Sequence, residues 1–201
     1  SLMFMICDEL KIGLLTDHVA LKEINRHVTK QRIEQKFSLI NESLKKDFGI
    51  QKPKIAVLSI DPHAGDGGVI GKDDQDILKP VLLEIASKNN LVFGPFSSDS
   101  FFGSGQHKKY DAVLAIYHDQ GLIPFKTLSF GSGVNYTAGL NKVRTSPDHG
   151  TGYDIAGKGL ADSTSFKNAI FSAIEIFKSR KLFEDLNKNP LNLSNSKTAK
   201  K

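Results

Sequence analysis

The chain has 201 residues, of which 39% are hydrophobic and 24% are charged, an ordinary globular composition that excludes a fibrous or wholly disordered protein. Its formal net charge of +5 does not predict a nucleic-acid partner, because the excess is spread along the chain and no aromatic residues are interleaved with the basic C-terminal stretch. No apolar run approaches the roughly 20 residues of a membrane-spanning helix, and a single cysteine excludes an internal disulfide framework, so we expect a cytoplasmic protein without a membrane partner.

The first half of the chain shows strand patterns alternating with helix patterns. The apolar spacing predicts strands at residues 11–16, 54–60 and 91–93, and helical segments at residues 21–48 and 73–87. Residues 29–31 mark a junction between two helices in the first segment, and Pro80 must either kink the second segment or begin its second half. A glycine-rich stretch at residues 61–68 follows the second strand and lets a ligand approach the backbone closely. This alternation favours an α/β fold.

The strand around which the chain is organised lies at residues 112–116. It is apolar and leads into the polar residues 117–120, which we expect in a turn closed by Gly121. Ligands of open α/β sheets bind beyond the carboxyl ends of the strands, so this polar cluster is well placed to meet a metal or a substrate. The alternative is that His118 and Asp119 only cap the turn.

The C-terminal part predicts one amphipathic helix followed by a tail. Residues 163–178 place apolar side chains on one helix face and begin with a serine and threonine cap. Beyond Leu182 the composition turns to Asn, Lys, Ser and Pro, and we expect residues 181–201 to form a mobile tail.

Three histidines each follow a predicted strand by a few residues: His18, His63 and His118. If the three strands share a sheet, or meet across a dimer, the imidazoles converge. Three neutral imidazoles with an open position suit a divalent ion such as zinc, which would polarise a hydroxyl group and stabilise its alkoxide. Asp119 could orient a ligating histidine. The spacing of the histidines matches no recognised metal motif.

Loop residues offer further candidates. Arg144 and residues 149–151 could hold anionic groups, because phosphates are bound by cationic side chains and by glycine-rich backbone amides, although a plain loop explains them equally. Asp99 fits either a helix cap, which we favour, or a site carboxylate. His107 lies between polar neighbours and is expected at the surface.

Several blocks of sequence, in a fixed order, carry a resemblance to a known family. They are TDH at 16–18, DPHAGDGG at 61–68, YHDQG at 117–121 with Lys126 just downstream, GVN at 133–135, and RTSPDHGTG at 144–152 leading into DIAGKG at 154–159. Together they resemble the 4-hydroxythreonine-4-phosphate dehydrogenase family of pyridoxal phosphate biosynthesis, over roughly residues 5–180. The resemblance implies an α/β fold of isocitrate/isopropylmalate dehydrogenase-like architecture, with a mixed sheet flanked by helices.

The resemblance also assigns roles to residues. It places the family's metal ligands, which hold zinc, magnesium or cobalt and are shared between two subunits of a homodimer, at His18, His63 and His118. It places the groups that hold a small phosphorylated substrate at Lys126, Asn135 and Arg144. A segment similar to one that lies against the dinucleotide in isocitrate and isopropylmalate dehydrogenases contains His149, Gly150, Thr151 and Asp154. This is not a Rossmann fingerprint, because no G-x-G-x-x-G follows a strand here.

The activity implied by the resemblance is an oxidation with NAD or NADP. The family converts 4-phosphooxy-L-threonine to 2-amino-3-oxo-4-phosphooxybutanoate, which decarboxylates to 3-amino-2-oxopropyl phosphate in vitamin B6 synthesis. Lysine and arginine suit the phosphate and carboxylate of such a substrate. Two alternatives stay open: a dehydrogenase of another four-carbon acid phosphate, such as threonate or erythronate 4-phosphate, and a non-catalytic metal- or phosphate-binding dimer.

The family's members are considerably longer, and this chain resembles them without their N-terminal lobe. We therefore expect residues 13–149 to form a metal-binding and dimerisation domain and residues 150–180 to return to the absent N-terminal cofactor domain. The apolar face of the helix at residues 163–178 should then be exposed. The chain should fold and dimerise but have little or no dehydrogenase activity.

Overall fold

The structure, a computed structural model, describes residues 1–129 and 131–189. Its centre is a mixed sheet with the strand order β4-β3-β5-β2-β1-β6-β7. The strands are β1 (Leu2–Ile6), β2 (Lys11–Leu14), β3 (Lys54–Leu58), β4 (Leu91–Phe96), β5 (Ala112–Ala115), β6 (Val134–Ala138) and β7 (Thr145–Pro147). Strands β4, β3, β5 and β2 are parallel, whereas β1 is antiparallel to β2 and β6, and β6 is antiparallel to β7. The predicted α/β fold with a mixed sheet is confirmed.

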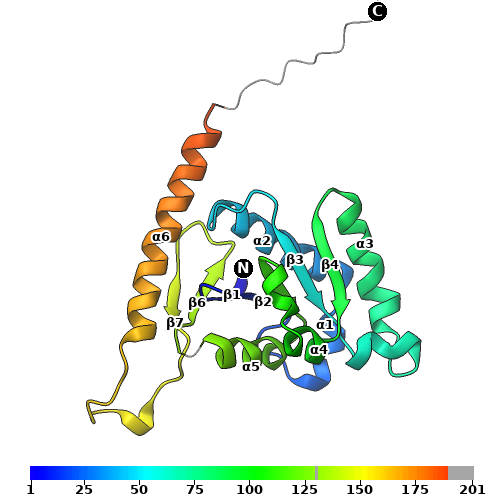
Figure 1. The fold of residues 1–201 in the computed structure, drawn as a ribbon, viewed down its shortest axis with the longest axis horizontal. Coiled ribbons are helices and arrows are strands. Elements are labelled where there is room, and N and C mark those ends of the chain that lie inside the picture. The colour runs from blue at the N-terminus through cyan, green and yellow to red at the C-terminus, as the bar shows by residue number, and fades with distance from the viewer. Residues whose placement is uncertain (130, 190–201) are drawn as a thin grey trace, which may run out of the picture.

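Helices cover both faces of this sheet (Figure 1). They are α1 (Ile24–His27), α2 (Lys30–Lys46), α3 (Lys79–Ser87), α4 (Ser98–Gly103), α5 (His118–Ser129) and α6 (Thr164–Asn187). Successive residues of β3 alternate between two buried clusters, so the clusters lie on opposite faces. One cluster takes apolar side chains from α2, α3 and α6, and the other takes them from α4 and α5. Of the helices in the described part of the chain, none combines the length and apolarity needed to cross a membrane.

The predicted elements of the first half are present, with boundaries shifted by a few residues. Thr29 separates α1 from α2 and caps α2, because its side chain accepts a hydrogen bond from the backbone N–H of Arg32. The helical segment at residues 73–87 divides into a π-helical turn, η3 (Asp74–Leu78), and α3. Pro80 lies in the first turn of α3, where a proline loses no helical hydrogen bond, so it begins the second half of the segment.

Two elements differ from the sequence prediction. Strand β1 was not predicted, yet it lies inside the sheet between β2 and β6. The polar residues after β5 were expected in a turn, but α5 begins at His118, so that prediction was wrong. Gly121 lies within α5 and does not close a turn. A Cβ at Gly121 would lie 2.8 Å from Cγ2 of Ile12, so glycine is needed there because α5 packs closely on the sheet.

The long helix α6 lies beside β6 and β7 at one side of the molecule (Figure 1). The side chains of Ser165, Ala169, Ile176 and Arg180 are buried against the rest of the chain. Other apolar side chains of α6 are exposed by 45% to 63%: Phe166, Ile170, Phe171, Ile174 and Phe177. The predicted exposed apolar face is therefore present.

The end of α6 corrects the predicted start of the tail. The helix continues to Asn187, so residues 181–187 are helical although we expected them in a mobile tail. Residues 190–201 of the predicted tail lie outside the described residues.

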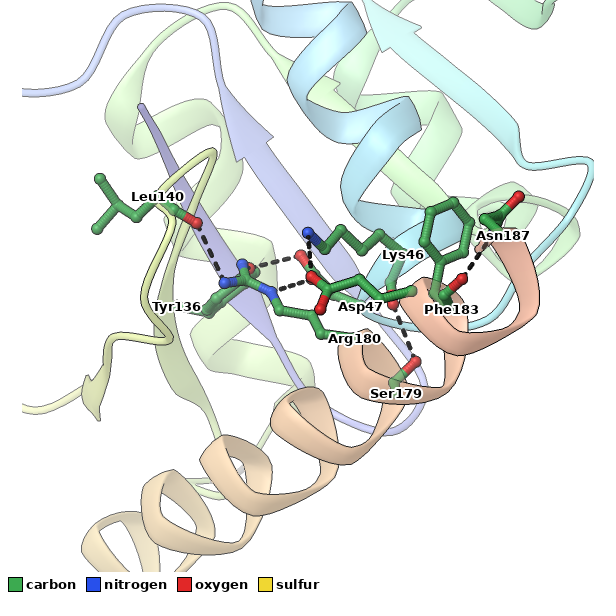
Figure 2. Close-up of polar contacts among 9 residues, drawn as sticks. Lys46, Asp47, Tyr136, Leu140, Ser179, Arg180, Phe183 and Asn187 are labelled. Atoms are coloured by element: carbon green, nitrogen blue, oxygen red, sulfur yellow. Dashed lines mark hydrogen bonds and ion pairs between the residues drawn. The ribbon is translucent and has the colours of Figure 1, made fainter. Parts of the chain in front are cut away.

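A buried polar network fixes α6 to the sheet. Figure 2 shows the guanidinium of Arg180 reaching Asp47, Tyr136 and the backbone of Leu140. Nε of Arg180 donates to Oδ1 of Asp47 at 2.6 Å, and a terminal nitrogen donates to the hydroxyl of Tyr136 at 2.7 Å. At the residue before Arg180, the hydroxyl of Ser179 donates to the backbone carbonyl of Lys46 at the end of α2. These contacts set the position of α6 within this chain.

Candidate functional site

Strands β2, β5 and β3 are parallel neighbours, so their carboxyl ends meet at one edge of the sheet. Each strand is followed by one predicted metal ligand: His18 after β2, His63 after β3 and His118 at the start of α5. Beyond the strands, the backbone N–H and the hydroxyl of Thr16 both donate to the carbonyl of Ile116, at 3.1 and 2.8 Å. These bonds keep the segments that carry His18 and His118 together.

His18 and His118 form a pair. The centroids of their imidazole rings are 5.3 Å apart. Two imidazoles on one tetrahedral ion, each with a metal–nitrogen distance of about 2.0–2.1 Å, would have their ring centroids roughly 5 Å apart, so the separation of these two rings is compatible with two ligands of one divalent ion. Nδ1 of His118 lies 2.7 Å from Oδ1 of Asp119. Because an ionised carboxylate can only accept a hydrogen bond, Nδ1 carries the proton and donates it. Nε2 of His118 is then the nitrogen with a free lone pair, as a metal ligand requires.

His63 lies apart from this pair. It is exposed and follows β3 in a loop where residues 63–67 all have positive φ. Its charge contributes to a lowered pKa of Asp99, which is caused chiefly by the hydrogen bond from Ser97 and next by the backbone N–H of Ser100. Within residues 1–129 and 131–189, no group of three or more His, Cys, Asp or Glu side chains is arranged to hold a metal ion. One chain therefore brings together two of the three predicted ligands.

Asp99 and His107 differ from the roles we favoured. Ser97, not Asp99, is the N-cap residue of α4, and Asp99 lies in the first turn, where Ser97 Oγ donates to its carboxylate at 2.7 Å. His107 is 7% exposed rather than at the surface. Its burial, with a smaller contribution from Lys108, lowers the pKa of its imidazole.

Two polar residues at this edge make hydrogen bonds that the sequence did not reveal: Asp74, which is buried and was not a candidate, and the half-buried Gln120, which belongs to the predicted polar cluster at residues 117–120. The carboxylate of Asp74 accepts the backbone N–H groups of Ile60 and Asp61, at 2.8 and 2.9 Å. The amide of Gln120 bonds to groups near the ends of both β3 and β5. Asp74 stands in an acidic run that looks solvent-exposed in the sequence, and only the fold shows that it is buried. For Gln120, the signal in the sequence was its position two residues after His118.

The predicted substrate residues lie on different elements. Lys126 is exposed in α5, and Asn135 lies in β6 with an Oδ1 atom that is buried and has no hydrogen-bond partner among the described residues. Arg144 is exposed just before β7 and donates to the hydroxyl of Thr137 at 3.0 Å. These positions supply two cations and one amide, and their role in binding stays a prediction.

The predicted cofactor residues lie in the connection between β7 and α6, and all of them are exposed. They are His149, Gly150, Thr151 and Asp154. Nδ1 of His149 donates to the adjacent carbonyl of Gly150 at 2.9 Å. A Cβ at Gly150 would meet no atom within 4 Å, so this part of the loop is open on the surface. Their contact with a dinucleotide stays a prediction.

The fold and this edge of the sheet define a class of protein. An α/β sheet with histidines, a carboxylate and cations beyond its parallel strands is typical of an enzyme that binds a small polar ligand at that edge. The family model described as "Pyridoxal phosphate biosynthetic protein PdxA" matches residues 1–173. The chain belongs to this family.

Relatives in the family carry one activity in their names. The 4-hydroxythreonine-4-phosphate dehydrogenase of Bacteroides thetaiotaomicron is 49% identical over 191 residues, which cover 95% of this chain and 52% of the relative. The protein of the same name from Prosthecochloris aestuarii is 48% identical over 167 residues, covering 83% of this chain and 49% of the relative. The chain thus spans about half the length of the curated relatives it matches.

Solved structures agree with the family and with its isocitrate dehydrogenase-like fold. The 4-hydroxythreonine-4-phosphate dehydrogenase of Klebsiella pneumoniae is similar with a TM-score of 0.75 and 36% identity, covering 87% of this chain and 53% of that one. A terephthalate 1,2-cis-dihydrodiol dehydrogenase from Burkholderia xenovorans is similar with a TM-score of 0.68 and 31% identity, covering 84% and 53%. Dehydrogenases with different substrates thus share this half of the fold.

Proposed function

We propose that this chain supplies the metal-binding and dimer-forming part of an NAD(P)-linked 4-hydroxythreonine-4-phosphate dehydrogenase of vitamin B6 synthesis. The single observation that carries the proposal is the pairing of His18 and His118 at the carboxyl ends of the parallel strands. In this pair, Nδ1 of His118 is hydrogen-bonded to Asp119. In this reaction the 3-hydroxyl of 4-phosphooxy-L-threonine is oxidised to give 2-amino-3-oxo-4-phosphooxybutanoate, which decarboxylates to 3-amino-2-oxopropyl phosphate.

The metal site is proposed to lie between two copies of the chain. His18 and His118 come from one subunit, and the third ligand is the partner subunit's His63, because His63 does not join the pair within one chain. Imidazole donors suit zinc, and cobalt or magnesium are the alternatives. When bound, the ion would polarise the substrate hydroxyl and stabilise the developing alkoxide.

The other residues are proposed to bind and orient the substrate. Lys126 and Arg144 supply positive charge for the phosphate and carboxylate, and the planar guanidinium of Arg144 can hold either group with two hydrogen bonds. The unpartnered Oδ1 of Asn135 is an acceptor that a substrate hydroxyl or amino group could satisfy. Asp119 holds the proton of Nδ1 and so fixes the tautomer of His118.

The first test is a metal and subunit-mixing experiment. Purified wild-type chain should bind about one Zn²⁺ per subunit and elute as a dimer, and His18→Ala, His63→Ala and His118→Ala should each lose the ion. His27→Ala is the matched control and should keep it. Mixing His18→Ala with His63→Ala subunits should restore one site per mixed dimer, because one of its two sites then has all three histidines intact. No recovery in proven mixed dimers would refute the shared site.

The substrate needs a separate test with a full-length relative of this chain. The activity is expected with 4-phosphooxy-L-threonine, and a panel should include threonate and erythronate 4-phosphates. The dihydrodiol dehydrogenase among the structural neighbours favours running this panel, because its name describes a substrate without phosphate. Binding of metal and phosphate without turnover of any panel member would favour the non-catalytic dimer.

A further inference from the structure

The loop that carries His63 has an unusual backbone. Residues 63–67 have φ values from 44° to 78°, and three of them, His63, Ala64 and Asp66, have side chains. A left-handed conformation crowds the Cβ atom of such residues against the backbone, so surrounding contacts must hold it.

Asp74 holds the segment just before this loop. Its side chain is 1% exposed, and its two carboxylate oxygens accept the consecutive N–H groups of Ile60 and Asp61, at 2.8 and 2.9 Å. Burial raises the pKa of Asp74, and these two hydrogen bonds oppose the shift. A buried carboxylate is costly, whereas an asparagine has one acceptor oxygen and would turn an NH₂ group toward the second N–H.

Gln120 holds the same segment at Ser59. Its Nε2 donates to the carbonyl of Ser59 and to the hydroxyl of Ser98, both at 2.8 Å. Its Oε1 accepts the backbone N–H of Ile116 at 2.7 Å. One side chain, two residues after His118, thus ties the end of β5 to the end of β3 and to the start of α4.

We propose that Asp74 and Gln120 are positioning residues that fix backbone 59–61 and thereby set the imidazoles of His63 and His118. The two side chains bind three consecutive backbone groups, the carbonyl of Ser59 and the N–H groups of Ile60 and Asp61. Their effect on zinc binding rests on the proposed function, because it requires these histidines to be ligands. Their effect on the histidine positions does not.

The test compares Asp74→Asn and Gln120→Glu with matched exposed controls from η3, Asp76→Asn and Gln75→Glu. Hydrogen exchange at the amides of Ile60 and Asp61 should rise at least about tenfold in Asp74→Asn, while Val57 in β3 stays protected. Zn²⁺ affinity, measured by titration calorimetry, should fall about 10- to 100-fold in both site variants. The Co²⁺ absorption bands, which report ligand geometry, should shift. The controls should match the wild type.

Wild-type Zn²⁺ affinity and Co²⁺ bands in folded site variants would overturn the proposal, even with faster exchange, because the role would then be structural only. If Asp74→Asn does not fold, Ser98→Ala takes its place, since it removes one acceptor of Gln120 without burying a charge. If the wild-type dimer binds no Zn²⁺, the proposed function loses its metal site. The ring ¹³C signals of His63 and His118 then decide the positioning proposal: they should move in the site variants and stay in the controls.

Discussion

The network around Arg180 makes a sharp prediction about stability. The substitution Arg180→Ala removes three donated hydrogen bonds, to Asp47, to the Tyr136 hydroxyl and to the carbonyl of Leu140. It leaves the carboxylate of Asp47, whose side chain is 3% exposed, without its positive partner. The hydroxyl of Tyr136 stays neutral and keeps its hydrogen bond to Asp47, because burial and the neighbouring carboxylate raise its pKa.

The magnitude follows from the groups left behind. Removing one member of a buried ion pair typically costs 3–5 kcal/mol, about what it takes to leave the other charge buried and unpaired. Asp47 keeps hydrogen bonds from the hydroxyls of Ser43 and Tyr136, so we expect the lower end, about 3 kcal/mol. For a chain of this length that corresponds to a fall in Tm of roughly 6–12 °C.

The assay is urea unfolding followed by far-ultraviolet circular dichroism, since the chain has no tryptophan. The matched control is Lys188→Ala, which breaks an ion pair with Asp185 whose lysine side chain is 70% exposed and should change stability by about 0.5 kcal/mol or less. The double variant Asp47→Asn/Arg180→Met should lose less than the sum of its single variants. A loss below about 1 kcal/mol for Arg180→Ala, with an unchanged m-value, would show that the pair is solvated and that the reasoning is wrong.

Three further predictions concern packing and pH. Gly121→Ala should cost about 1–3 kcal/mol, because its Cβ would meet Ile12, Ala115 and Leu14 at 2.8–3.0 Å, whereas Gly150→Ala, which meets nothing, should be neutral in the same urea assay. Phe177→Ser on α6, where the side chain is 63% exposed, should cost less than about 1 kcal/mol in this chain; a larger loss would show that the face is already covered, for example in a dimer. Burial lowers the pKa of His107 in the folded state, so its contribution to stability is present above the pKa of the unfolded state and is lost as the pH falls. The free energy of unfolding should therefore drop between about pH 7 and 5. The variant His107→Gln should show less of this drop.

The parts of the fold that the sequence predicted are those where local pattern and tertiary environment agree. Residues 55–58 are apolar because β3 is buried on both faces, so the strand is visible without knowing its neighbours. The opening strand β1 was missed because its residues, LMFMI, are apolar without alternation and include a single β-branched residue, so no strand pattern stands out. Helix α5 was missed because Gly121 and Pro124 are helix-breaking residues by propensity, and only close packing on the sheet explains Gly121 inside a helix.

The candidate site divides in the same way. The positions of His18, His63 and His118 beyond three strands could be predicted, since strand ends are visible in the sequence and parallel neighbours share an edge. The burial of Asp74 and His107 could not, because each lies among polar residues and becomes buried only through contacts distant in sequence. Which histidines pair within one chain also depends on strand order, which periodicity does not reveal.

Metal binding and turnover should therefore be separable in this chain. The strands that precede the three histidines are contiguous in the sheet, and their ends are joined by bonds within the chain, from Thr16 to Ile116 and from Gln120 to Ser59. The predicted cofactor segment is exposed instead, and a dinucleotide needs a concave surface that buries most of it. We expect the dimer to bind Zn²⁺ but to reduce little or no NAD or NADP with 4-phosphooxy-L-threonine, measured as absorbance at the wavelength of the reduced cofactor. Turnover at the rate of a full-length relative would show that this half of the fold completes the cofactor site by itself.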